Sequence, residues 1–270
     1  MNEFTRDGLT FDVSDEGSPD GDAIVLLHGF PETKESWDAV VPTLVAAGHR
    51  VLRPDQRGYS PRARPRGRRA YRSSELVADV LALADAARVD TFHLVGHDWG
   101  GAAAWATAIA HPDRVESLTV LSTPHPRAMV QSMVRSTQLL HSWYMLAFQL
   151  PWVPERMFGG RQARKSLVRS GLPAEKVAFY LERIGDMTGA INWYRALPFS
   201  PPARNAPVTV PTTYVYSTGD FALGRKAADL TARHVTGPYR YEVLDGVSHW
   251  IPEEAPDAVA RLILENVGSS

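Results

Sequence analysis

One aspartate of this chain stands where the backbone can direct its side chain toward a substrate. Asp98 lies at the centre of the run "GHDWG", between an apolar stretch that predicts a buried strand and an alanine-rich stretch that predicts a helix. The two glycines allow a sharp turn, and the start of the helix brings backbone N–H groups and a positive dipole end close to the carboxylate. The sequence therefore predicts an ionised, accessible nucleophile at Asp98, with a helix-capping aspartate as the alternative.

A histidine and a second aspartate, each placed after a predicted strand, would complete the chemistry that a nucleophilic carboxylate requires. His249 lies in a Gly-Val-Ser-His turn before a helix that begins with proline, and Asp220 follows another predicted strand. A carboxylate that attacks an sp³ carbon forms an alkyl-enzyme ester, and a base must then activate water to hydrolyse that ester. We expect His249 to be this base, and Asp220 to orient its imidazole and to stabilise its protonated form.

The rest of the chain predicts the elements that hold these residues in place. Short apolar runs bounded by turns predict strands at residues 23–30, 49–55, 91–96, 115–122, 211–217 and 239–244. Apolar periodicity and helix-start residues predict helices at residues 73–87, 99–110, 226–234 and 252–266. Because strands and helices alternate, the predicted fold class is α/β, with a mostly parallel, doubly wound sheet.

The alternation stops between the predicted strands 115–122 and 211–217. This stretch is helical in pattern and rich in aromatic residues, and it ends in the proline-rich run "SPPARNAPVTVP". We interpret it as a helical lid inserted into one α/β domain. The expected boundaries are a main domain of residues 1–126 and 206–270 and a lid of residues 127–205.

Six short motifs, in a fixed order along the chain, carry a family resemblance. They are "HGFPE" (28–32), "PDQRGYS" (54–60), "GHDWGG" (96–101), "STPHP" (122–126), "STGDFAL" (217–223) and "GVSHWIPEEAP" (246–256). With these motifs the chain resembles the α/β-hydrolase fold, and specifically its epoxide hydrolase branch, which neighbours the haloalkane dehalogenases. The resemblance covers essentially the whole chain, and it implies the order nucleophile, lid, acid, histidine.

The resemblance also implies roles for the turns around the nucleophile. Backbone N–H groups of Phe30 and Trp99 would hold the oxyanion that forms during ester hydrolysis. The peptide bond before Pro31 is a candidate for the cis form, which the sequence leaves open. His28 and His97 flank glycines within the motifs, and no third ligand has suitable spacing, so we interpret them as packing residues of the site and expect no metal.

Two lid tyrosines distinguish between the branches of the family. Tyr144 and Tyr194 stand where the epoxide hydrolases that this chain resembles carry one tyrosine each, and two phenols directed at one oxygen can protonate the alkoxide of an opening epoxide. The alternative is that both tyrosines only pack the lid. The residues expected to line an apolar substrate pocket are His28, Pro31, His97, Trp143, Phe148, Trp193 and Trp250. The lid residues Met145, Leu150 and Trp152 are expected to line the same pocket or to pack the lid against the main domain.

A haloalkane dehalogenase with the same Asp-His-Asp triad is the main alternative. Such an enzyme usually carries Asn after His-Gly, where this chain has Phe30, or a second halide-binding Trp in the lid, which the lid tryptophans do not exclude. Fluoroacetate dehalogenases usually follow the nucleophile with Arg, where this chain has Trp99. An esterase fits worst, since neither Ser60 nor Ser122 lies in a glycine turn of this kind. The third hypothesis is a non-catalytic binding protein on the same fold.

The composition bears on partners and location. The formal net charge of the 270 residues is −1, so no global field attracts nucleic acid or an anionic membrane, and the arginine-rich loop at residues 61–72 is best explained as solvated surface. The chain has no cysteine, no run of about 18 apolar residues, and no signal-peptide pattern at its start. We expect a cytoplasmic enzyme that acts on a small hydrophobic epoxide and water, with no cofactor and with neither nucleic acid nor membrane as a partner. Whether it forms a homodimer stays open.

Overall fold

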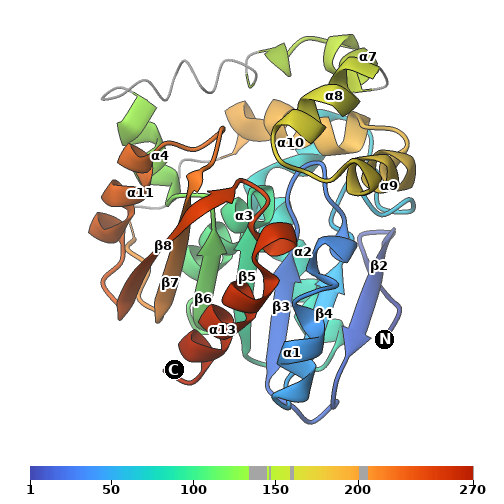
Figure 1. The fold of residues 1–270 in the computed structure, drawn as a ribbon. Helices are drawn as coiled ribbons and strands as arrows, with labels where there is room; N and C mark the ends of the chain where they lie inside the picture. The colour runs from blue at the N-terminus through green and yellow to red at the C-terminus, as the bar shows by residue number, and fades with distance from the viewer. Residues whose placement is uncertain (134–144, 146, 159–160, 201–205, 270) are drawn as a thin grey trace.

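In the residues that the structure describes, 1–133, 145, 147–158, 161–200 and 206–269, an eight-stranded sheet forms the centre of this computed structural model (Figure 1). The strand order is β1-β2-β4-β3-β5-β6-β7-β8. The strands are β1 Glu3–Arg6, β2 Leu9–Glu16, β3 Ala23–Leu27, β4 Arg50–Pro54, β5 Phe92–His97, β6 Val115–Leu121, β7 Thr212–Gly219 and β8 Tyr239–Ser248. Strands β3 to β8 are parallel, which confirms the predicted α/β fold class.

The first two strands form an antiparallel hairpin at one edge of the sheet, which we did not expect from the sequence. Asp7 and Gly8 make the turn with φ values of +50° and +76°, a conformation that Asp-Gly pairs adopt in tight hairpins. Phe4, Phe11 and Val13 are buried, while more polar residues between them lie nearer the solvent. This pattern has the period of a strand, but it contains too few apolar residues to predict one by itself.

Helices cover both faces of the sheet and produce three layers (Figure 1). Helices α1 (Val41–Ala46) and α13 (Pro256–Val267) share one buried cluster with Ile24 and Leu26 of β3. Helices α2 (Ser73–Ala86) and α3 (Trp99–Ala110) share the opposite cluster with Val25 and Leu27. Alternate side chains of β3 thus enter different clusters, so this strand is buried on both faces. The remaining elements of the main domain are α11 Arg225–Thr231, α12 Ile251–Glu254 and the 3₁₀ turns Lys34–Trp37, Arg68–Tyr71 and Ala232–His234.

The C-terminal helical region differs from the expectation of one helix at residues 252–266. The structure has two helices, α12 and α13, and Ala255 between them adopts φ −132° and ψ 49°. The residue before a proline is disfavoured in the helical conformation, so Pro256 ends one helix and begins the next. The helix predicted at residues 226–234 is likewise shorter, since α11 passes into a 3₁₀ turn.

Between β6 and β7 the chain leaves the sheet and forms helices over the carboxyl ends of the strands (Figure 1). They are α4 Pro126–Met133, α7 Val153–Phe158, α8 Arg161–Arg169, α9 Ala174–Ile184 and α10 Thr188–Ala196, followed by the 3₁₀ turn Leu197–Phe199. A helical lid was expected here, and its boundaries at residues 127 and 205 stay a prediction. No helix in the described ranges combines the length and apolar character needed to cross a membrane.

The start of α3 lies very close to the end of β3. A Cβ atom added at Gly100 would be 2.2 Å from the carbonyl O of Leu27 and 2.6 Å from that of His28. These neighbours are backbone atoms, which cannot rotate away as a side chain can. Gly100 therefore sets how closely the helix that follows Asp98 approaches the sheet.

We expect Gly100→Ala to lower the free energy of unfolding by about 3 kcal/mol, because β3 and α3 must move apart to accept the methyl group. Chemical unfolding followed by circular dichroism measures this loss. The matched control is Gly268→Ala after α13, where the nearest heavy atom would be 3.5 Å away. It should change stability by no more than about 0.5 kcal/mol. Equal effects of the two substitutions would contradict the packing constraint.

Candidate active site

Asp98 occupies the turn between β5 and α3 in a conformation that residues with a side chain rarely adopt. Its φ is +48° and its ψ is −117°, and strain of this kind costs of order 1–3 kcal/mol. The surrounding turn holds it, since its carbonyl O accepts hydrogen bonds from Thr123 Oγ1 (2.6 Å) and from Ala102 N (3.1 Å). The side chain of Asp98 is 18% exposed, so the strained turn leaves the carboxylate accessible.

His249 and Asp220 lie beside Asp98 at the carboxyl ends of β8 and β7. Nδ1 of His249 is 2.8 Å from Oδ2 of Asp220, and Nε2 of His249 is 3.6 Å from Oδ2 of Asp98. The other oxygen of Asp220 accepts hydrogen bonds from the backbone N–H groups of Ala222 (2.8 Å) and Leu223 (3.0 Å). Asp220 is thus fixed at both oxygens, and it orients the imidazole so that Nε2 faces Asp98.

The charges of these three residues determine their protonation. Burial by itself would lower the pKa of His249, but the charges of Asp220 and Asp98, and the hydrogen bonds to them, raise it well above its ordinary value. Burial would raise the pKa of both aspartates, but His249 and backbone N–H donors lower them instead. The resting site therefore holds an imidazolium between two carboxylates.

A second turn presents a backbone donor to the same carboxylate. The N–H of Phe30 donates to Oδ1 of Asp98 over 2.9 Å, and the peptide bond between Phe30 and Pro31 is cis. His28 supports this turn. The backbone N–H of Gln56 donates to its Nε2 (3.2 Å), so its Nδ1 carries the proton and donates to the next carbonyl O (2.9 Å). Burial lowers the pKa of His28, which agrees with a neutral ring in a structural role.

A second buried ion pair lies behind the imidazole, and the sequence analysis did not identify it. Nδ1 of His97 is 2.8 Å from Oε2 of Glu32, and its Nε2 is 2.9 Å from the carbonyl O of His249. Both partners carry acceptor oxygens, so each ring nitrogen of His97 has an acceptor within hydrogen-bond distance. Burial would raise the pKa of Glu32, but the charge of His97 and the hydrogen bond to it lower that pKa. The sequence signal for this pair is only the glutamate directly after Pro31.

Aromatic residues of the lid meet the two turns of the main domain. The ring of Tyr194, on α10, contacts Phe30 at 5.3 Å and Trp99 at 4.8 Å between ring centroids, both edge to face. It also contacts Phe148 at 4.7 Å, and its side chain is buried. Phe30 donates to Asp98, and Trp99 follows Asp98 in the chain, so the ring of Tyr194 packs against both turns that hold the carboxylate.

Two of the tryptophans predicted for the pocket connect the lid to the main domain. Nε1 of Trp193, on α10, donates to the carbonyl O of Arg57 over 2.7 Å. Nε1 of Trp250 donates to Oγ of Ser170, which follows α8, over 3.1 Å, and its ring lies edge to face with His249 at 5.2 Å. Both indoles are buried. In each indole the single N–H group therefore forms a hydrogen bond that connects the lid to the main domain.

Of three further predicted residues, the structure describes Trp99. Trp99 is the first residue of α3, a position whose N–H has no partner within the helix and so suits an oxyanion donor. Tyr144 and Trp143 lie outside the residues that the structure describes. Of the two predicted tyrosines, Tyr194 alone can be located relative to the triad.

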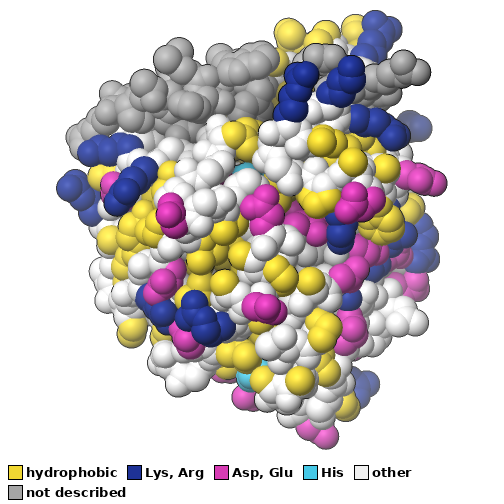
Figure 2. Space-filling view, in the orientation of Figure 1, with side chains coloured by type: hydrophobic (Ala, Val, Ile, Leu, Met, Phe, Trp, Pro, Cys, Tyr) yellow, Lys and Arg dark blue, Asp and Glu magenta, His cyan; other side chains and the backbone are white. Residues whose placement is uncertain are grey.

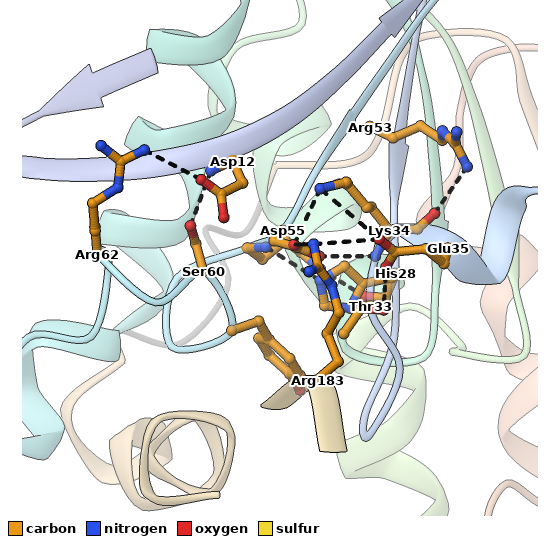
Figure 3. A network of polar contacts seen from close by, with 12 residues as sticks. Asp12, His28, Thr33, Lys34, Glu35, Arg53, Asp55, Ser60, Arg62 and Arg183 are labelled. Atoms are coloured by element: carbon orange, nitrogen blue, oxygen red, sulfur yellow. Dashed lines mark hydrogen bonds and ion pairs between the residues drawn. The ribbon is translucent and has the colours of Figure 1, made fainter. Parts of the chain in front are cut away.

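Ion pairs connect lid helix α9 to the main domain near the start of the 3₁₀ turn Lys34–Trp37 (Figure 3). Nη2 of Arg183 lies 3.1 Å from Oδ2 of Asp55 and 3.3 Å from Oε1 of Glu35. Asp55 is buried and also accepts from the backbone N (3.0 Å) and Nζ (3.3 Å) of Lys34. Because one buried carboxylate binds both Arg183 of α9 and Lys34 of the 3₁₀ turn, it helps to hold α9 against this part of the chain.

Comparisons with known proteins agree with this fold. The family model described as the alpha/beta hydrolase fold matches residues 22–256. The AB hydrolase superfamily protein YfhM of Bacillus subtilis (strain 168) is 38% identical, with 96% of this chain and 94% of the relative covered. Epoxide hydrolase A of Mycobacterium tuberculosis is 32% identical, with 96% and 94% covered. The crystal structure of epoxide hydrolase A from Mycobacterium thermoresistibile matches with a TM-score of 0.85 at 28% identity, over 98% of this chain and 97% of that one.

We expect Asp220→Asn to lower the pKa of His249, because it removes one of the two carboxylate charges that raise it while the opposing effect of burial remains. Titration of the histidine side chains by NMR checks this, since His249 should lose its proton at a lower pH than in the unchanged protein. Asp257→Asn, at the exposed start of α13, is the control and should leave that pKa where it was. An unaltered titration in Asp220→Asn would show that the assigned charge balance is wrong.

Proposed function

This chain belongs to the epoxide hydrolase branch of the α/β hydrolase fold family, and from that membership and the geometry of its site we propose that it hydrolyses epoxides to vicinal diols. The observation that carries the proposal is the placement of His249 between Asp98 and Asp220. Aromatic rings lie around the turns beside the nucleophile, so the proposed substrate is a small hydrophobic epoxide.

In the proposed first step, Asp98 attacks a ring carbon, and a C–O bond of the epoxide breaks as the ester bond forms. Oδ1 already accepts the N–H of Phe30, so Oδ2 is the proposed attacking atom and Oδ1 becomes the ester carbonyl oxygen. The electron pair of the broken bond stays on the ring oxygen, which takes up a proton. Tyr194 is the proposed donor, together with Tyr144.

In the proposed second step, His249 activates water against the ester carbonyl. Esterification turns Asp98 into a neutral group, which removes one of the two charges that raise the pKa of His249. The imidazolium then loses its proton more readily, and this proton restores the phenol of the tyrosine that protonated the ring oxygen. The neutral imidazole can now take a proton from the attacking water, and Asp220 stabilises the imidazolium that results.

The N–H of Phe30, with that of Trp99, would hold the oxyanion. When this intermediate collapses, the bond between the acyl carbon and the substrate-bound oxygen breaks, and that oxygen takes the second proton of the water and leaves as part of the diol. Asp98 is then again a carboxylate beside the imidazolium.

The two other hypotheses differ from this one in their products. A haloalkane dehalogenase would use the same triad but would release a halide, which needs N–H donors and no proton. The strained backbone of Asp98 and the buried charges around it cost stability, and a non-catalytic role would not explain why they are present. Incubation with styrene oxide and, separately, with 1-bromobutane distinguishes the three. Formation of diol without bromide supports the proposal, and bromide without diol assigns the chain to the dehalogenases. The absence of both products would favour a binding protein.

We expect His249→Gln to form the alkyl-enzyme ester but to hydrolyse it roughly 10²–10⁴-fold more slowly, because glutamine cannot take the proton from water. Mass spectrometry of the intact protein after incubation with styrene oxide should show a gain of one substrate mass. Asp98→Ala is the control and should show neither adduct nor turnover. Normal turnover by His249→Gln would refute the mechanism.

We expect Tyr194→Phe to slow ester formation roughly 10²-fold, since the phenol serves the developing alkoxide. Hydrolysis of the ester, once formed, should change little. Single-turnover mass spectrometry in the His249→Gln background isolates the first step. Tyr241→Phe, which removes a hydroxyl near the exposed Asp229, is the matched control. An unchanged rate of adduct formation would make Tyr194 a packing residue.

A further inference from the structure

The outer surface of the lid carries exposed apolar residues at the turn before α7. Trp152 is 73% exposed, Leu150 50% and Val153 45%. The expectation that Trp152 and Leu150 line the pocket or pack the lid is therefore wrong, because the turn directs both side chains to the solvent. Neighbouring apolar residues on a surface mark an interaction site, unlike single scattered ones. Figure 2 shows hydrophobic side chains at the edge of the molecule that α7 and α8 form in Figure 1, with Lys and Arg side chains beside them.

The backbone of this turn is firmly held. The guanidinium of Arg195, on α10, donates to the carbonyl O atoms of Phe148 (3.0 Å) and Leu150 (2.5 Å) and pairs with Glu155 on α7 (2.5 Å). Trp152 lies between these contacts and has a φ of +59°. One cation therefore binds both sides of the turn, and the indole is presented to the solvent by a fixed backbone.

Exposed basic side chains lie on the two helices that follow the apolar turn. They are Arg156 on α7 and Arg164, Lys165 and Arg169 on α8, and the sequence of α8 contains no acidic residue. The acidic residue of α7, Glu155, is already paired with an arginine of the lid. The formal net charge of the whole chain is −1, so this part of the lid is locally cationic on a nearly neutral protein.

We propose that this surface, formed by Leu150, Trp152, Val153 and the four exposed cations, docks the protein on an anionic lipid bilayer. Tryptophan and aliphatic side chains are stabilised in the interfacial region of a bilayer, and Lys and Arg bind the phosphate groups of anionic lipids. A polar anionic partner would satisfy the cations but leave the apolar turn in water, whereas a lipid surface satisfies both. Docking of this kind requires no spanning helix. The expectation of no membrane partner rested on the net charge, which averages over this asymmetry.

The test is sedimentation of the full chain with vesicles of phosphatidylcholine, alone or with about 30 mol% phosphatidylserine. We expect binding to the mixed vesicles at low salt and at least about tenfold weaker binding to phosphatidylcholine alone. Binding to the mixed vesicles should weaken as NaCl rises to about 0.5 M, because salt screens the attraction between the cations and the lipid phosphates.

Two variants separate the apolar contribution from the charged one. Trp152→Asn, and the double change Arg164→Glu with Lys165→Glu, should each weaken binding to mixed vesicles roughly tenfold or more. Asparagine is chosen because it adopts a positive φ, such as that of Trp152, more readily than most residues. Thermal unfolding like that of the unchanged protein verifies that each variant is folded. Val243→Ser and Arg66→Glu are matched controls, because they alter an exposed apolar and an exposed basic residue on other surfaces. Both should bind as the unchanged protein does.

Three outcomes would overturn the proposal. The first is no binding to mixed vesicles at low salt, and the second is binding that neither Trp152→Asn nor the charge reversal weakens. The third is the absence of vesicle binding together with a dimer that Trp152→Asn dissociates, since the surface would then join two copies of the chain. None of these measurements involves catalysis, so their result is independent of the proposed reaction.

Discussion

The site depends on one buried imidazolium held between two carboxylates. His249 is 3% exposed, and Asp220 and Asp98 lie on opposite sides of its ring. A buried charge is costly unless a partner of opposite sign lies within contact distance, so the charge of His249 and those of the two carboxylates stabilise one another. This requirement ties together the carboxyl ends of β5, β7 and β8. It also means that any event that neutralises Asp98 changes the basicity of His249.

Two neighbouring features hold His249 and Asp98 in these positions. Behind the triad, the ion pair of Glu32 and His97 holds the carbonyl O of His249 in place. Beside it, the strain at Asp98 is maintained by packing, since Gly100 lets α3 approach the end of β3. Both depend on parallel strands whose carboxyl ends meet at one edge of the sheet, where loops from distant parts of the chain converge.

The lid has an inner and an outer surface with different chemistry, and α10 contributes to both. Toward the sheet, Trp193 donates to the main domain and Tyr194 contacts the aromatic residues beside the nucleophile. Toward the outside, Arg195 holds the turn that exposes Trp152. Three consecutive residues can serve opposite surfaces because successive positions of a helix point about 100° apart.

The sequence by itself determined the α/β class, the parallel strands and the placement of Asp98, Asp220 and His249 after them. These features follow from local signals, namely apolar periodicity, glycines around a turn, and residues at the ends of strands. Only the tertiary structure decided that Glu32 pairs with His97, 65 positions away, that His28 is neutral, and that Trp193 turns its indole toward Arg57. Partner choice and protonation depend on distances between segments remote in the chain, and no local pattern encodes those distances. The β1–β2 hairpin and the break at Pro256 were missed for the opposite reason, because their local signals were present but weak or outweighed by the surrounding helical pattern.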